Sequence, residues 1–211
     1  MLHHSPLTHN RTGKRRIRPS VTTGHYKDLR VLLLPGWLDS DAGHWQSRWE
    51  RRHGWQRVVQ DDWQWPRRGD WMMRLDEVLL ASSTPALLVA HSLGCQLVAA
   101  WSAHSRLRER VRGALLVAPP DVERDDMPPQ LFSWQPIVRE RLPFASIVVT
   151  SSDDPFCAPE RAAQMAQQWG SELHALGPLG HINAASGLGD WPAGLALLQG
   201  LAEPSDTIHA W

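Results

Sequence analysis

Cysteine, tyrosine and phenylalanine are scarce in this chain. Its 211 residues include 2 cysteines, 1 tyrosine and 3 phenylalanines. Cys95 and Cys157 lie far apart and form no CxxC pair, which excludes a disulfide framework and a cysteine-based metal site and favours a reducing compartment. The spacing of the histidines does not resemble a metal site either. We therefore expect neither a metal nor a cofactor.

Long apolar runs are also absent. No run approaches the roughly 20 residues that a transmembrane helix needs. Residues 1–28 lack the central apolar stretch of a secretory signal. Their Arg-rich, nearly acid-free composition resembles that of a transit peptide, although no clear amphipathic helix is evident. We expect a cytoplasmic protein that does not act at a membrane.

The chain has no net charge, since 22 basic groups balance 22 acidic ones. Residues 1–28 hold six of the basic groups and one acid, which leaves 16 basic and 21 acidic groups in the remainder, a net charge of −5. That balance argues against nucleic acid as a partner. We interpret residues 1–28 as a disordered basic arm, 29–203 as one folded domain and 204–211 as a C-terminal tail.

Tryptophan, in contrast, is abundant, with 12 residues. Because other aromatic side chains are few, we expect tryptophan to supply the aromatic volume of the core. A tryptophan-lined pocket is the alternative, and the two are compatible. Much of the tryptophan clusters early in the chain, at Trp37, Trp45, Trp49, Trp55, Trp63, Trp65 and Trp71.

From residue 30 onward, short β-type apolar runs alternate with helical patterns. Most of the runs are too short and too continuous for half-exposed strands, which indicates a parallel sheet with helices on both faces. The strands are expected at Val31–Leu34, Gln56–Val59 (weakly), Ala86–Ala90, Ala114–Val117, Ser146–Thr150 and Glu172–Leu176. The helices are expected at Gly43–His53, Asp70–Leu80, Gly94–His104, Pro159–Trp169 and Trp191–Leu201.

We predict an α/β domain with about six mainly parallel strands in the order 2-1-3-4-5-6. One segment breaks the alternation. The proline-rich stretch Asp121–Pro143 predicts a loop-rich excursion with a short helix near Ile137–Arg141. In a parallel sheet such an excursion leaves from the carboxyl ends of the strands, where ligands bind.

A candidate nucleophile lies where the third strand ends. The sequence Val89-Ala90-His91-Ser92-Leu93-Gly94 places a serine between a strand and a helix, as in the G-x-S-x-G nucleophile elbow. Ala90 replaces the first glycine, and its small side chain still suits the sharp turn. His91 precedes the nucleophile, and we expect it to pack rather than to act as the base.

A serine nucleophile needs a base that an acid orients, and in α/β-hydrolases the chain order is Ser, acid, His. Asp154 follows the fifth strand and His181 follows the sixth, in that order. Asp154 is preferred to Asp153 because Pro155 suits the turn after the acid. Asp121, after the fourth strand, is a further alternative, since some hydrolases draw their acid from that strand.

An acyl-transfer site also needs donors for the developing oxyanion. The main-chain N–H of Leu93, directly after the nucleophile, is one candidate. The loop after the first strand supplies the other, and Gly36 allows it to turn so that the N–H of Trp37 faces the site. His44 is expected to line the site or to hold this loop, and Asn183 is expected in the pocket or in support of its loops.

Four stretches resemble a known family: PGWLDSDAGHWQSRWE, VAHSLGCQ, SSDDPFCAPERA and GHINAASGLGDWPAG. They are similar to the small serine hydrolases grouped with retinoblastoma-binding protein 9 and bacterial YdeN, over about Arg30 to Leu201. The resemblance implies a minimal α/β-hydrolase sheet with little lid. It also implies Ser92 as nucleophile, Asp154 as acid and His181 as base. It does not reach the arm before residue 28.

These observations predict a serine hydrolase that cleaves a small acyl ester. Amides and thioesters are further candidate substrates, because they would react through the same acyl-enzyme intermediate. The expected partner is a small-molecule acyl substrate. A partner-binding protein with idle or vestigial catalysis is one alternative. A C–C hydrolase or a cofactor-free haloperoxidase with the same residues is another.

Overall fold

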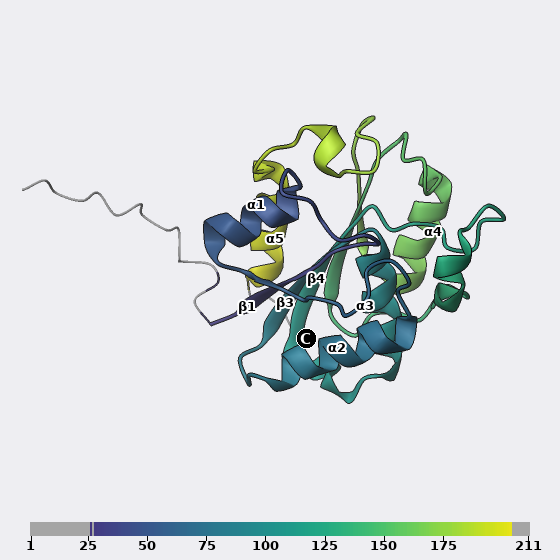
Figure 1. Ribbon diagram of the computed structural model, residues 1–211. Helices are drawn as coiled ribbons and strands as arrows, with labels where there is room; N and C mark the ends of the chain where they lie inside the picture. The colour runs from purple at the N-terminus through teal and green to yellow at the C-terminus, as the bar shows by residue number, and fades with distance from the viewer. Residues whose placement is uncertain (1–25, 27, 204–211) are drawn as a thin grey trace, which may run out of the picture.

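The computed structural model describes Tyr26 and residues 28–203 (Figure 1). The expected basic arm, apart from Tyr26 and Asp28, and the expected tail at 204–211 lie outside the described residues. Across the described part of the chain, none of the helices has the length and apolar character needed to cross a membrane.

Six strands form one sheet in the order β2-β1-β3-β4-β5-β6, as predicted. All neighbouring strands are parallel. The strands are β1 (Arg30–Leu34), β2 (Gln56–Arg57), β3 (Ala86–His91), β4 (Val111–Val117), β5 (Ala145–Thr150) and β6 (Glu172–Ala175). The helices are α1 (Trp45–His53), α2 (Arg68–Leu80), α3 (Leu93–His104), α4 (Pro159–Trp169) and α5 (Pro192–Ala202).

The central strands are covered on both faces, as their continuous apolar runs predict. Every residue of β3 is buried. Alternate residues of β1 point to opposite cores: Leu32 and Leu34 pack with α2, α3 and α4, whereas Val31 and Leu33 pack with α1 and α5. Figure 1 shows α1 and α5 together on one side of the sheet. The edge strand β6 differs, because three of its four residues are exposed.

The proline-rich excursion contains no helix at Ile137–Arg141, so that prediction is wrong. A 3₁₀ helix lies earlier instead, at Pro129–Trp134. Residues 137–141 are irregular because their main-chain groups bind other segments: the N–H of Ile137 donates to Glu123 Oε1 at 3.0 Å, and the carbonyl of Val138 accepts from the indole of Trp169 at 2.7 Å. These tertiary bonds replace those that a helix would make.

Most of the tryptophans build the core, as expected. Trp45, Trp49, Trp71, Trp101, Trp134 and Trp169 are all at most 2% exposed. Buried indole N–H groups need acceptors. Trp101 donates to the carboxylate of Asp76 at 2.6 Å, and the other five bind main-chain carbonyls. Trp45 donates to Ile182 at 2.8 Å and Trp49 donates to Asp190 at 2.7 Å. The tryptophans therefore attach loops to the helix layers.

Gly194 of α5 is expected to be essential for this packing. A Cβ added at Gly194 would lie 2.3 Å from the ring of Trp191. That ring cannot retreat, because it packs against Trp45 and Trp49 with centroid distances of 4.9 and 5.9 Å. We predict that Gly194→Ala lowers the free energy of unfolding by about 1–3 kcal/mol, the usual cost of overpacking.

Gly200 provides the matched control in the same helix. A Cβ added there meets nothing within 4 Å, so Gly200→Ala should be neutral or stabilise by about 0.5–1 kcal/mol through helix propensity. Urea unfolding of the two variants and the wild type measures both effects. Equal stabilities of the two variants would contradict the packing argument.

Candidate active site

Ser92 occupies a sharp turn between β3 and α3. Its backbone has φ 52° and ψ −123°, a strained conformation for a residue with a side chain. The turn is tight against the end of β1, since a Cβ at Gly94 would lie 2.3 Å from the carbonyl oxygen of Leu34. The strand-to-helix context that the sequence predicts is therefore present, with glycine at the position of closest contact.

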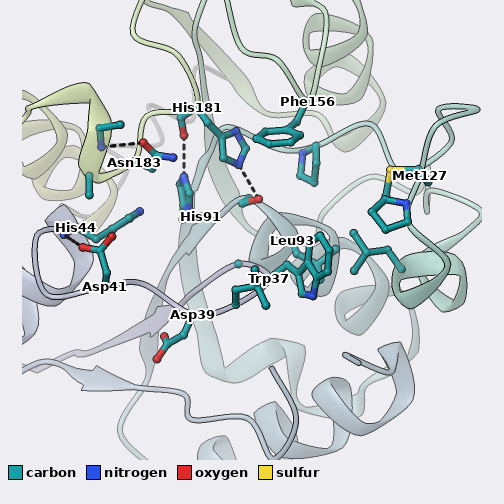
Figure 2. Close-up of a pocket in the computed structure, with 18 of the residues that line it drawn as sticks. Trp37, Asp39, Asp41, His44, His91, Leu93, Met127, Phe156, His181 and Asn183 are labelled. Carbon is teal, nitrogen blue, oxygen red and sulfur yellow. Dashed lines mark hydrogen bonds between the residues drawn. The ribbon is translucent and has the colours of Figure 1, made fainter. Parts of the chain in front are cut away.

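A chain of hydrogen bonds connects Ser92 to a histidine and a carboxylate. Figure 2 shows the first of these bonds, between the ring of His181 and the serine hydroxyl. His181 Nε2 lies 2.8 Å from Ser92 Oγ, and His181 Nδ1 lies 2.9 and 3.0 Å from the two Asp154 oxygens. The side chains of His181 and Asp154 are only 9% and 4% exposed. Because a carboxylate accepts at Nδ1, the proton of neutral His181 belongs on that nitrogen. Its Nε2 lone pair is then free to accept the proton of Ser92.

The two alternative acids lie elsewhere. Asp153 is exposed, and its Oδ1 accepts from the Ser151 hydroxyl and the Gly180 N–H, both at 2.7 Å. These bonds lower the pKa of Asp153 and hold the turn that carries His181. Asp121 lies 3.3 Å from Arg161 Nε and caps the N–H of Glu123. Asp154 is the candidate acid that meets His181.

The two N–H groups expected to bind an oxyanion are both available. Among the described residues, the main-chain N–H groups of Trp37 and Leu93 donate to no protein acceptor. The loop that presents Trp37 is anchored by its neighbours, since Trp37 Nε1 donates to the carbonyl of Gln64 and the Leu38 N–H to that of Trp63. Gly36 brings this loop against the elbow, because a Cβ there would lie 2.6 Å from Ser92 Cβ.

The ring of His91 lies between those of His181 and His44 and is next to both. The centroid of His91 is 4.9 Å from that of His181 and 4.6 Å from that of His44. Burial lowers the pKa of His44 to about 4 and lowers that of His91 well below its usual value, so both rings are neutral at pH 7. The structure therefore places two uncharged imidazoles beside the candidate base.

Both histidines hold parts of the site in place. His91 Nε2 donates to the main-chain oxygen of His181 at 2.9 Å, which ties the elbow to the histidine loop. His44 is the N-cap of α1, where its Nδ1 accepts from the N–H of Gln46 at 3.1 Å. Asn183 lines the pocket and also caps a short 3₁₀ helix (Ala184–Ser186) by accepting from the Ala185 N–H.

Sequence reasoning missed one buried amide that connects two strands. Gln46 is fully buried in α1. Its Nε2 donates to the carbonyl of Leu34, the last residue of β1, at 3.3 Å and to that of Val89, within β3, at 3.0 Å. It therefore joins the strand before the Trp37 loop to the strand before Ser92. A single glutamine in an amphipathic helix carries no sequence signal for such a role.

The site opens into a pocket of about 530 Å³. Of the tryptophans in the described part of the chain, only Trp37 lines this pocket. The alternative of a tryptophan-lined pocket is therefore met by a single residue. Within the described chain, no group of three or more His, Cys, Asp or Glu side chains is arranged to hold a metal ion. The pocket is lined by Gly36, Trp37, Leu38, Asp39, Asp41, His44, His91, Ser92, Leu93, Pro120, Arg124, Asp126, Met127, Pro128, Leu131, Phe156, His181, Asn183, Ala184 and Ala185.

Comparison with known proteins identifies the family. A family model described as serine hydrolase matches residues 31–200. A crystal structure described as a YdeN-like hydrolase from Pectobacterium atrosepticum is 33% identical, with a TM-score of 0.75 over 84% of this chain and 92% of that chain. The ydeN gene product of Bacillus subtilis is 22% identical, with a TM-score of 0.64 over 82% and 97% of the two chains.

A more distant neighbour supports the fold alone. The thioesterase domain from the curacin biosynthetic pathway is 15% identical, with a TM-score of 0.53 over 83% of this chain and 91% of that chain. No match to a curated protein sequence was found. The family model covers most of the chain, and the sheet is that of a minimal α/β-hydrolase. The chain thus belongs to the serine hydrolases, as a small α/β-hydrolase of the YdeN family.

Proposed function

We propose that Ser92, His181 and Asp154 form a catalytic triad that hydrolyses a small carboxylic ester through an acyl-enzyme. The observation that carries this proposal is the unbroken chain of hydrogen bonds from Ser92 Oγ through both ring nitrogens of His181 to Asp154, at the wall of a pocket. In such a chain the base is already oriented toward the nucleophile before substrate binds.

The mechanism follows from the positions of these atoms. His181 Nε2 accepts the proton of Ser92 as Oγ attacks the ester carbonyl, and Asp154 stabilises the resulting imidazolium. The N–H groups of Trp37 and Leu93 bind the oxyanion, where loss of one such donor costs about 10²–10³-fold in kcat. The imidazolium then protonates the departing alcohol. Water, deprotonated by the same nitrogen, releases the carboxylic acid and restores Ser92.

An ester is the preferred substrate, because alcohol departure from the tetrahedral intermediate is easier than amine departure. Amides and thioesters would pass through the same acyl-enzyme. The complete set of aligned groups favours catalysis over a partner-binding protein with idle or vestigial catalysis. Product analysis with candidate substrates separates ester hydrolysis from C–C hydrolysis or haloperoxidase activity on the same residues.

Labelling with a fluorophosphonate probe tests the proposal. We expect the wild type to be labelled, with the adduct on the peptide that contains Ser92, and Ser92→Ala to remain unlabelled. His181→Ala should be labelled far more slowly, because Ser92 then lacks its base. If the folded wild type stays unlabelled while a control hydrolase reacts, the proposal of a catalytic triad is wrong.

A further inference from the structure

We propose that the pocket has two arms that meet at Ser92, an apolar arm for the acyl chain and a polar arm for a hydroxyl-bearing alcohol. The substrate class would then be an ester of a short or medium-length apolar carboxylic acid with a polyhydroxylated alcohol, such as a glycerol-type ester. This inference rests on the function proposed above and specifies the substrate of the same site.

The apolar arm consists of Leu93, Met127, Leu131 and Phe156 together with the rings of Pro120 and Pro128. Figure 2 shows Leu93 and Met127 on one side of His181 and Asp41, His44 and Asn183 on the other. The outer end of this arm is ionic, because Arg124 pairs with Asp126 at 2.5 Å and their side chains are 31% and 68% exposed. Such a wall favours binding of an apolar acyl chain until the chain is long enough to reach the ion pair.

The polar arm offers an oriented donor. Asn183 Oδ1 accepts from the N–H of Ala185 at 3.0 Å, which turns the amide NH₂ away from that bond. In Figure 2 the nitrogen of Asn183 points toward His91 and His181. Among the described residues, this NH₂ group has no hydrogen-bond acceptor. Two N–H donors therefore face the space next to the candidate base.

The same arm offers an acceptor. Asp41 Oδ1 accepts from the N–H groups of Gly43 and His44 at 2.7 and 3.0 Å, which fixes the carboxylate and leaves Oδ2 without a partner in the described chain. A hydroxyl both donates and accepts, so a diol can bind a carboxylate oxygen and an amide NH₂ together. Asp39 lies nearby but is paired with Arg57 at 2.5 Å. Asp41 would repel an anionic alcohol.

The order of the reaction supports this assignment of the arms. The water that hydrolyses the acyl-enzyme attacks from the position that the alcohol oxygen has vacated, because His181 Nε2 serves both steps. The arm that held the alcohol must therefore admit water, and a polar arm does. The arm that holds the acyl chain stays filled during this step, and an apolar wall keeps water out of it.

Two pairs of matched esters test the inference in the full-length enzyme. Ethyl hexanoate and glyceryl monohexanoate release the same acid and differ only in the alcohol, and a pH-stat records both. We expect kcat/KM to be about tenfold higher for the glyceryl ester, the size of one hydrogen bond to a charged group. Glyceryl monoacetate and monohexanoate differ only in the acyl chain, and each added methylene should raise kcat/KM up to about fourfold.

Two variants test whether the alcohol preference comes from the polar arm and the acyl preference from the apolar arm. Asn183→Ser keeps a hydroxyl to cap Ala185 and removes the amide donors, so the glyceryl-to-ethyl ratio should fall several-fold. Met127→Trp narrows the apolar arm, so the hexanoate-to-acetate ratio should fall while the glyceryl-to-ethyl ratio changes little. Met73, which is 65% exposed on α2, gives the control Met73→Trp, in which both ratios should equal those of the wild type.

Fluorophosphonate labelling separates this inference from the proposed function. If Ser92 is labelled but the wild type shows no preference for the glyceryl ester, the two-arm assignment is wrong and the triad stands. An unchanged glyceryl-to-ethyl ratio in Asn183→Ser, or an unchanged acyl preference in Met127→Trp, also overturns it. If Ser92 is not labelled, the proposed function itself fails.

Discussion

Asp154→Asn is expected to lower kcat by about 10⁴-fold with little change in stability. An amide at this position donates through its NH₂ group to His181 Nδ1, which stabilises the tautomer with the proton on Nε2. That proton would then face Ser92, and the ring could no longer accept the serine hydrogen. Since the Asp154 side chain is only 4% exposed, no water replaces the carboxylate easily. Steady-state hydrolysis of a p-nitrophenyl ester measures the loss.

Two aspartates serve as matched controls for this substitution. In Asp153→Asn the retained carbonyl oxygen can still accept from Ser151 and Gly180, so the turn before His181 should persist. In Asp121→Asn the ion pair with Arg161 is lost, at a site with no contact to His181. Each control should retain activity within about tenfold of the wild type. A larger loss in either control than in Asp154→Asn would overturn the assignment of the acid.

Gly36→Ala is expected to lower kcat/KM by about 10²–10³-fold, the effect of losing one oxyanion donor. The added methyl would lie 2.6 Å from Ser92 Cβ and 3.1 Å from Ser92 Oγ. Neither segment can yield easily, since the elbow is packed against β1 and the loop is anchored at Gln64. The loop must therefore retreat and carry the Trp37 N–H away from the oxyanion.

Gly69→Ala is the control for this substitution. A Cβ added at Gly69, in the first turn of α2, meets nothing within 4 Å, so the activity should equal that of the wild type. Circular dichroism and thermal unfolding establish that Gly36→Ala remains folded. Wild-type kcat/KM in a folded Gly36→Ala would show that the Trp37 loop does not contribute to transition-state binding.

The strand order was predictable because apolar runs and strand-to-helix alternation restrict the topology to few forms. Element boundaries were less accurate. The strand expected at Gln56–Val59 contains only Gln56–Arg57, and the helix expected at Gly43–His53 begins at Trp45. In the second case His44 caps the helix through its side chain, a role that the pattern of apolar residues does not indicate.

The convergence of Ser92, Asp154 and His181 could be predicted because parallel strands deliver their carboxyl ends to one edge of the sheet. The hydrogen bonds that hold the surrounding segments in place could not be predicted. His91 binds a main-chain oxygen 90 positions away, and Gln46 binds main-chain carbonyls of two strands. Main-chain acceptors are present at every residue, so no residue type marks the partner in the sequence. The fold has to be known before such bonds can be identified.

We expect the attachment of the late loops to α1 to determine when the proposed triad assembles during folding. The indoles of Trp45 and Trp49 bind carbonyls 137 and 141 positions later, and contacts of such sequence separation form slowly because a long loop must close. During synthesis the serine and the aspartate leave the ribosome before the histidine does. In the proposed function Ser92 depends on His181 as its base, so we expect Ser92 to remain an ordinary alcohol until residues 181–190 have docked onto α1.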